Sequence, residues 1–251
     1  MKKSTFFPLV ALLIILFTAC SKTTDAPADP ATNPQQDNAA KVLAYIKALG
    51  FPASSIVEKP TEFIVEEDIS FPKNMQVPEG KPKTEQFYTG SLVSPANVAN
   101  IRLFVDPSMT SMMSEIKSAI AQWNAVANCN INWVVVAAAP YDVRIVDANL
   151  GNGVCGAGTF PSGGLAGNLI RINKAYIAGN VFAQRARTIC HEMGHNVSFR
   201  HTNWQAIGES AATPVPTVPG TDPLSLMNGG QCGSGATVLS TNDKLAAAAL
   251  Y

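Results

Sequence analysis

Histidine is scarce in this 251-residue sequence, which contains only three, at positions 191, 195 and 201. Charged side chains make up 14% of the residues and their formal charges sum to zero. No charge excess therefore favours the capture of nucleic acid. Hydrophobic residues make up 47%, which indicates a globular chain, and the length fits one domain with additional segments.

The sequence also lacks an apolar run long enough to cross a membrane comfortably, because the N-terminal run spans only residues 6–17. Lys2 and Lys3 precede this run, and small residues end it, which predicts an export signal over residues 1–19. Its end, "LFTAC", resembles the lipobox of bacterial lipoproteins and implies lipidation of Cys20. We expect an exported protein anchored to a bacterial membrane, with the outer membrane favoured, facing the periplasm or the cell surface. A plain secretory signal is the alternative.

No two cysteines have the C-x-x-C spacing of a cysteine-rich metal site. Beyond Cys20 the chain contains Cys129, Cys155, Cys190 and Cys232. An even number of cysteines in an oxidising compartment predicts two disulfides, for which three pairings are possible.

The sequence does not support a nucleotide site either. Residues 151–156, "GNGVCG", match G-x-G-x-x-G after an expected strand. A dinucleotide site requires this loop to open a helix, but "AGTFPSGGLAGN" follows. We therefore expect no nucleotide partner.

Composition divides the rest of the chain into three parts. Residues 20–38 are rich in Pro, Thr, Asp and Ala, which predicts a disordered tether. Residues 39–90 form an N-terminal subregion or prosegment with an expected helix at 39–50 and a strand at 62–69. Residues 91–251 are expected to form the functional domain.

Hydrophobic periodicity predicts an α/β architecture for this domain. Two long helices are expected at 109–128 and 181–197, and a short one near 242–250. A glycine-rich loop is expected at 151–168, and proline-rich loops follow the second long helix. The expected strands cover residues 101–106, 131–138, 142–148 and 168–173.

The three histidines have the spacing of a metal site. His191 and His195 are four residues apart in an expected helix, so both imidazoles lie on one face. With Glu192 they form H-E-x-x-H, in which the histidines bind zinc and the glutamate is the general base. A continuous helix would place His201 about 9 Å beyond His195. The helix must therefore end in "NVSF" for His201 to become the third ligand.

Three protein ligands leave an open position, which is typical of catalytic zinc. A buried cluster of histidines is the alternative, but it leaves Glu192 and the four-residue spacing unexplained. A structural zinc site is also disfavoured, because the cysteines are better used as disulfides.

These motifs resemble a known family. "HEMGHNVSFRH" resembles the metzincin signature H-E-x-x-H-x-x-G-x-x-H. "TICHEMGHNVSFRHT", with "ALGF", "FIVEEDI" and "GTFPSGGLAGNLIRIN" upstream, resembles the HEIGH-motif metallopeptidases related to myxobacterial protease B, over about residues 40–235. Ser198 stands where the family has Gly, in a left-handed conformation that costs a non-glycine residue about 1 kcal/mol.

The resemblance implies a metzincin-like zincin of the α/β (α+β) class. A twisted mixed sheet would pack on two long helices, with a zinc-binding active-site helix and a loop-rich C-terminal part. "LSLMNGG" would supply the Met-turn, in which Met227 forms an apolar floor without binding the metal. The strand "LIRIN" would be the edge strand that pairs with an extended peptide.

The resemblance also implies disulfides Cys190–Cys232 and Cys129–Cys155, since metzincin geometry brings the zinc helix and the Met-turn together. We hypothesise that the N-terminal subregion masks the zinc, with Asp68 or a nearby acid at the open position. A solvated strand face is the alternative for these acids.

We therefore expect an exported endopeptidase with one catalytic Zn²⁺, acting on a peptide or protein substrate. Glu192 would receive the proton of the attacking water. The alternative is a zinc-containing surface-binding or adhesion lipoprotein on the same fold, without significant proteolysis. Intact Glu192 favours the enzyme, because a binding protein has no use for a general base.

Overall fold

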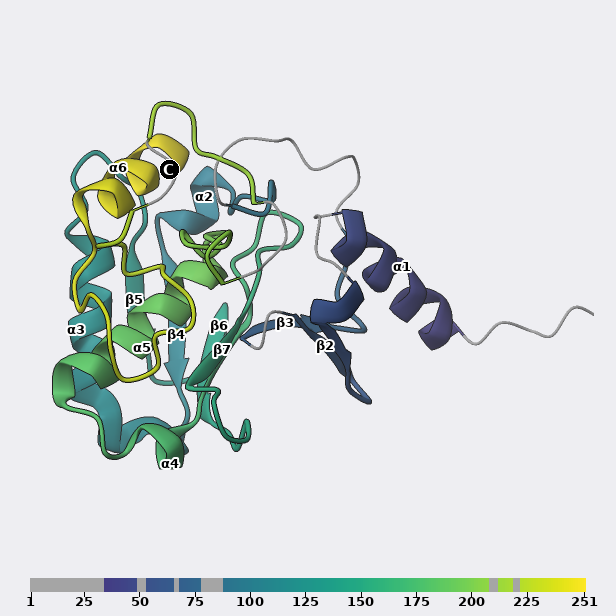
Figure 1. Cartoon of the computed structure of the whole chain (residues 1–251), viewed down its shortest axis with the longest axis horizontal. Helices are drawn as coiled ribbons and strands as arrows, with labels where there is room; N and C mark the ends of the chain where they lie inside the picture. The colour runs from purple at the N-terminus through teal and green to yellow at the C-terminus, as the bar shows by residue number, and fades with distance from the viewer. Residues whose placement is uncertain (1–33, 49–52, 66–67, 78–87, 208–211, 219–221) are drawn as a thin grey trace, which may run out of the picture. The chain divides into compact units, whose positions relative to one another are not determined.

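The computed structural model describes residues 34–48, 53–65, 68–77, 88–207, 212–218 and 222–251 (Figure 1). The expected signal at 1–19, the lipidation site Cys20 and the tether up to residue 33 lie outside the described residues. Within the described ranges, no helix is both long and apolar enough to span a bilayer.

A mixed sheet is the frame of the described chain. Its strands follow the order β1-β2-β3-β7-β8-β6-β4-β5. Strands β5, β4, β6 and β8 are parallel to one another, and β7 is antiparallel to β8. The expected mixed α/β architecture is confirmed. The strands are β1 Ile56–Glu58, β2 Glu62–Val65, β3 Ile69–Pro72, β4 Ile101–Val105, β5 Trp133–Val136, β6 Val143–Asp147, β7 Gly156–Thr159 and β8 Leu169–Ile172.

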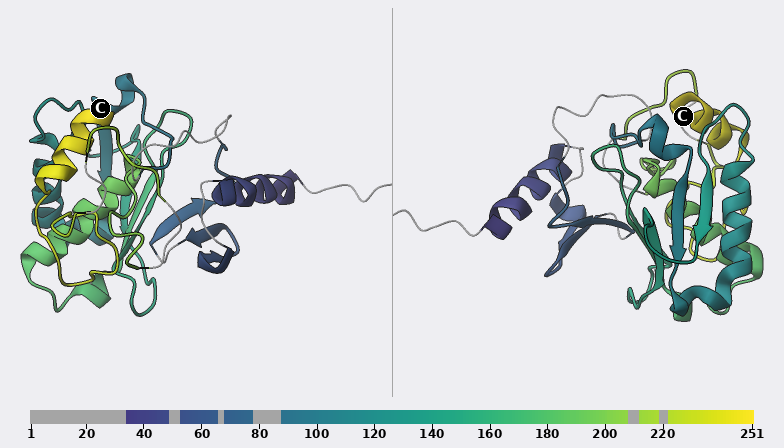
Figure 2. Two further views of the ribbon diagram at one scale, coloured as in Figure 1. Left: turned by 45° about the horizontal axis from the view of Figure 1, so that its top comes forward. Right: turned by 180° about the vertical axis from the view of Figure 1, so that it is seen from behind.

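Two long helices, α3 (Met113–Asn124) and α5 (Phe182–Asn196), pack side by side against the sheet (Figures 1 and 2). Apolar residues of both helices are buried together with residues of the central strands. Trp123 Nε1 donates to the carbonyl oxygen of Cys190 over 3.0 Å, which fixes α3 against α5. The α-helix observed here is shorter than the predicted 109–128, because the 3₁₀ helix η2 (Pro107–Met112) precedes α3.

The remaining helices of residues 88–251 are short. They are α2 Pro95–Val98, α4 Lys174–Ile177 and α6 Thr241–Leu250. Helix α6 begins with a capping box, in which the Ser240 side chain accepts from the Asp243 backbone N–H and the Asp243 carboxylate accepts from the Ser240 N–H.

The N-terminal part contains α1 (Pro34–Ala48), η1 (Ala53–Ser55) and the antiparallel strands β1–β3. Its core consists of Val42, Tyr45, Ile46, Phe63, Val65, Ile69 and Phe71, joined by Phe160 of the second part. Two predictions need correction. Residues 34–38, placed in the tether, belong to α1, and the single strand expected at 62–69 is divided between β2 and β3.

Strand β7 corrects two further predictions. It lies within the expected loop 151–168, and it separates β8 from the sheet edge, so "LIRIN" is an interior strand. Strand β7 approaches α5 closely, because a Cβ atom at Gly156 would meet Glu192 and one at Gly158 would meet the Glu192 backbone and His195. The glycines that permit this approach also remove the alternating side chains by which a strand is predicted.

Candidate metal and catalytic site

His191 and His195 project from the last turns of α5 and are buried. Each ring is oriented by a backbone carbonyl: His191 Nδ1 lies 3.0 Å from the Leu226 oxygen, and His195 Nδ1 lies 2.7 Å from the Phe199 oxygen. A carbonyl oxygen only accepts, so each Nδ1 carries the proton and each Nε2 presents a lone pair.

The chain reverses direction immediately after α5. The helix ends at Asn196, and the Phe199 N–H donates to the Gly194 carbonyl over 3.0 Å. This bond closes a Schellman-type turn. The reversal returns His201 to the other two histidines, and the His201 ring centroid lies 5.0 Å from that of His191.

Ser198 occupies the left-handed position of this turn, with φ of 83°. The strain of about 1 kcal/mol expected for a non-glycine residue is offset by a buried hydrogen bond. Its hydroxyl lies 2.9 Å from the Thr89 hydroxyl, and the Thr89 N–H donates to the Ser198 carbonyl over 3.1 Å. The turn is therefore fixed from a neighbouring segment.

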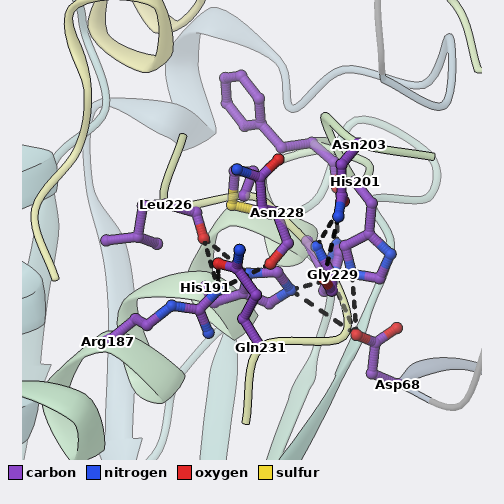
Figure 3. A network of polar contacts seen from close by, with 12 residues as sticks. Asp68, Arg187, His191, His201, Asn203, Leu226, Asn228, Gly229 and Gln231 are labelled. Atoms are coloured by element: carbon purple, nitrogen blue, oxygen red, sulfur yellow. Dashed lines mark hydrogen bonds and ion pairs between the residues drawn. The ribbon is translucent and has the colours of Figure 1, made fainter. Parts of the chain in front are cut away.

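The imidazole nitrogens converge with a carboxylate at one point. The Nε2 atoms of His191 and His201 are 3.1 Å apart, and Asp68 Oδ2 lies 2.9 Å from His201 Nε2, 3.7 Å from His191 Nε2 and 3.9 Å from His195 Nε2. The four ligand atoms all lie within 4.8 Å of one another. Figure 3 shows Asp68 pointing toward the histidine rings.

This donor set fits a zinc ion. Burial lowers the pKa of His191 to about 3, so this ring is neutral near pH 7. The buried Nε2 of His195 makes no hydrogen bond within the described part of the chain. Lone pairs that face one another without protons to share require a cation between them. Three imidazoles and one carboxylate match the ligand types and number that zinc prefers.

Asp68 and Glu192 have opposite electrostatic environments. Burial alone would raise the pKa of Asp68, but the three imidazoles around its carboxylate, His201 first among them, hold it well below its usual value. Burial, followed by the charge of Asp68, raises the pKa of Glu192 well above its usual value. Glu192 Oε2 is buried without a hydrogen-bond partner among the described residues, and Glu192 stands beside the ligand group without belonging to it.

Comparison with known families identifies the chain. The model of the dual-action HEIGH metallo-peptidases, Peptidase M57, matches residues 64–214, which include all three histidines, Glu192 and Asp68. The chain belongs to this family. It is therefore a zinc metallopeptidase that holds one zinc ion and acts on a peptide or protein substrate.

Solved structures similar to this HEIGH metallopeptidase include two of myroilysin, at 17% and 15% identity, with TM-scores of 0.43 and 0.45. They cover 62% and 69% of this chain and 93% of their own. Another is high choriolytic enzyme 1, a hatching-enzyme zinc protease from the medaka fish Oryzias latipes, with 15% identity, 64% and 93% coverage and a TM-score of 0.42. No curated protein matches the chain.

In this HEIGH metallopeptidase, Met227 packs against α5 at Gly194, the residue before His195. It is buried, and its sulfur and methyl group fill the space that a Cβ atom at Gly194 would need. Asp243, which sequence reasoning missed, fixes this turn by accepting from the Leu226 N–H over 2.8 Å and the Ser225 hydroxyl over 2.6 Å. The spacing of Ser240 and Asp243 is a capping signal that would have identified Asp243.

The predicted disulfides Cys190–Cys232 and Cys129–Cys155 are wrong. The structure joins Cys155 to Cys232 and leaves Cys129 and Cys190 as free thiols. Cys190 is one residue before His191, but it lies on another face of α5, where its sulfur is 4.0 Å from the Ala119 carbonyl oxygen of α3. Its thiol is therefore buried between the helices, away from the Met-turn.

A cavity of about 490 Å³ opens beside His191 and Glu192. One wall consists of residues 153–156, and another of residues 228–232, so the disulfide joins the two walls. Arg187, one turn before His191 on α5, lines the cavity, and Ser54 and Val57 of the N-terminal part also contribute. The enzyme therefore has space for a side chain next to its zinc-binding group.

Proposed function

We propose that the chain is an exported zinc endopeptidase that is made as a latent precursor. The observation that carries this proposal is the position of Glu192, a buried carboxylate with an unpartnered oxygen between the three histidines and an open cavity. A surface-binding protein would gain nothing from an uncompensated buried carboxylate, which costs folding free energy.

His191, His195 and His201 would hold the zinc ion, and Asp68 would take the remaining position in the precursor. The ion would supply Lewis acidity toward water and a peptide carbonyl. Glu192 accepts the proton of the attacking water and delivers it to the leaving amine.

The N-terminal part masks the site in two ways. Asp68 occupies a ligand position, and β3 covers the free edge of β7 through the parallel pairs Ile69–Gly158 and Ser70–Thr159. An extended substrate needs that edge for main-chain hydrogen bonds. While β3 is paired there, neither the edge nor the ligand position is available, so activation requires release of this segment.

Export and lipid anchoring at Cys20 complete the proposal, with support from the "LFTAC" motif and the charged, apolar segment before it. Mass spectrometry of the mature N-terminus tests this part: a diacylglyceryl-modified Cys20 is expected. An unmodified N-terminus elsewhere, with the protein in the soluble fraction, would contradict anchoring.

Casein hydrolysis tests the enzymatic part. The zinc-loaded full chain is assayed before and after limited proteolysis, with and without chelator, and beside Glu192→Ala. We expect cleavage only after proteolysis, and its loss with chelator and in the variant. A protein that holds one zinc ion per chain but cleaves nothing in a broad peptide library would instead be a binding protein on a peptidase fold.

A further inference from the structure

Arg187 is a buried cation at the wall of the cavity. The residue is only 4% exposed and lies on α5, one helical turn before the zinc-binding His191. Its Nη2 donates to the Asn228 carbonyl oxygen over 2.7 Å and to Gln231 Oε1 over 3.2 Å, and approaches the Leu226 oxygen at 3.4 Å. Figure 3 shows the guanidinium beside Gln231 and Asn228.

The guanidinium is not fully satisfied. Its Nε is buried and has no hydrogen-bond partner among the described residues. The acceptors that Nη2 uses are neutral, and within the described ranges no carboxylate lies within ion-pair distance of Arg187. Burying a guanidinium without an anion is costly.

Two other arginines, unlike Arg187, have a carboxylate partner. Arg185 on the same helix pairs with Glu115 at 2.7 Å, and Arg171 pairs with Glu62 at 2.6 Å. Both are more exposed than Arg187, with side-chain exposures of 28% and 14%, yet each has a carboxylate partner. The most buried of the three lacks one and lines a cavity large enough for a side chain.

We infer that Arg187 is a specificity-determining residue that selects a substrate with an aspartate or glutamate at the position after the scissile bond. This inference rests on the proposed peptidase function. The substrate carboxylate would pair with the guanidinium in the cavity and supply the missing anion. Apart from the histidines, Arg187 is the only basic side chain among the described residues that line this cavity.

With a substrate paired antiparallel to β7, the direction of this strand would place the acidic residue after the scissile bond. Strand β7 runs from Gly156 to Thr159, and the cavity lies at its Gly156 end. A substrate that pairs antiparallel to β7, opposite in sense to β3, runs from the Thr159 end toward Gly156. It passes the zinc-binding group first and enters the cavity with the residue that follows the cut.

Matched peptides that differ only by Asp or Asn after the scissile bond test the inference. The full chain is activated by limited proteolysis, and products are mapped by mass spectrometry. We expect kcat/KM to be at least about tenfold higher for Asp, because a charge-assisted hydrogen bond is formed with a buried guanidinium that has no carboxylate partner. Arg187→Gln should abolish most of this preference, and Arg185→Gln, which removes a charge from the same helix, should retain it.

A binding measurement with Arg187 intact tests the inference independently of whether Arg187→Gln folds. This is needed because Arg187 also bonds the segment after Met227. Product peptides that begin with Asp or Asn are titrated into zinc-loaded Glu192→Gln protein. This protein is prepared as the full chain and then activated by limited proteolysis. We expect at least about tenfold tighter binding of the Asp peptide, with the difference decreasing as salt is added.

The outcomes separate the two proposals. Equal cleavage of the Asp and Asn peptides by an active enzyme overturns the selectivity of Arg187 and leaves the peptidase function intact. Absence of cleavage of any peptide overturns the function, and the titration then decides the role of Arg187: tighter binding of the Asp peptide supports it, and equal binding overturns it.

Discussion

The N-terminal part, residues 34–77, and the second part, residues 88–251, differ in the strand pairing and the core that stabilise each of them. Strands β1–β3 pair antiparallel with one another over their own small core. Among the described residues they join the larger sheet through two residue pairs between β3 and β7, whereas β6 and β8 share four. The second part has its own extensive core around α3 and α5. A short parallel junction is what a releasable segment requires.

The two parts also contribute unequally to the site. The three histidines, Glu192 and the Met-turn belong to the second part, and the first contributes Asp68 and part of the cavity rim. In the proposed latent precursor, the N-terminal part supplies the ligand that blocks the site, and the second part supplies the residues that carry out the reaction. Changes in the second part should abolish chemistry, and changes in the first should release it.

Glu192→Gln should have the largest effect. Loss of the base should reduce kcat of the activated enzyme about 10²- to 10⁴-fold without changing zinc content, because Glu192 is not a ligand. Glu58→Gln, at an exposed carboxylate of the N-terminal part, is the matched control and should retain activity. A Glu192→Gln enzyme with near-normal kcat would exclude Glu192 as the base.

Removal of the Cys155–Cys232 disulfide should affect only the second part. The bridge closes a loop with a sequence separation of 77, so Cys155→Ser with Cys232→Ser should lower the free energy of unfolding by about 2–4 kcal/mol. Denaturant unfolding measures this difference. Cys129→Ser should change little, and equal destabilisation by that variant would indicate a different pairing.

Asp68→Ala should release activity in the uncleaved full chain. Without the carboxylate at the zinc, peptide hydrolysis before proteolysis should increase on the order of tenfold, a difference of about 1.4 kcal/mol. The increase should remain partial, because β3 still covers β7. Asp37→Ala, which removes an exposed carboxylate of α1, is the control. If Asp68→Ala leaves peptide hydrolysis before proteolysis unchanged, Asp68 does not block the enzyme.

Glu62→Gln should have the smallest effect. Glu62 pairs with Arg171 at 2.6 Å across the junction of the two parts, and both side chains are mostly buried. The neutral amide weakens this contact, so hydrogen exchange should become faster in β1–β3 and remain unchanged in α3 and α5. Uniformly faster exchange would mean that the two parts unfold together.

Sequence reasoning was most successful where one helix determines the geometry. The i, i+4 spacing of His191 and His195 and the expected chain reversal before His201 correspond to α5 and the turn at Ser198. Both follow from local backbone geometry. Asp68 could be named only as a hypothesis, because its place at the histidines depends on the β3–β7 pairing between distant segments.

The failures concern contacts that periodicity does not report. Strand β7 is hidden because Gly156 and Gly158 leave no side-chain alternation, and it occupies the place beside β3 that the family resemblance implies for β8. The disulfide prediction placed Cys190 by its sequence position next to His191, whereas its direction on α5 sends the thiol toward α3. The position of a residue in the sequence does not show toward which neighbour its side chain points from a helix, or which strands lie side by side in a sheet.

X-ray absorption spectroscopy of the zinc-loaded full chain tests the central claim most directly, because it reports the atoms bound to the metal. We predict one zinc ion per chain with three imidazole nitrogens and one carboxylate oxygen, and in Asp68→Ala the same three imidazoles with a water oxygen. A spectrum with sulfur ligands, or with fewer than three imidazoles in the native chain, would contradict the account.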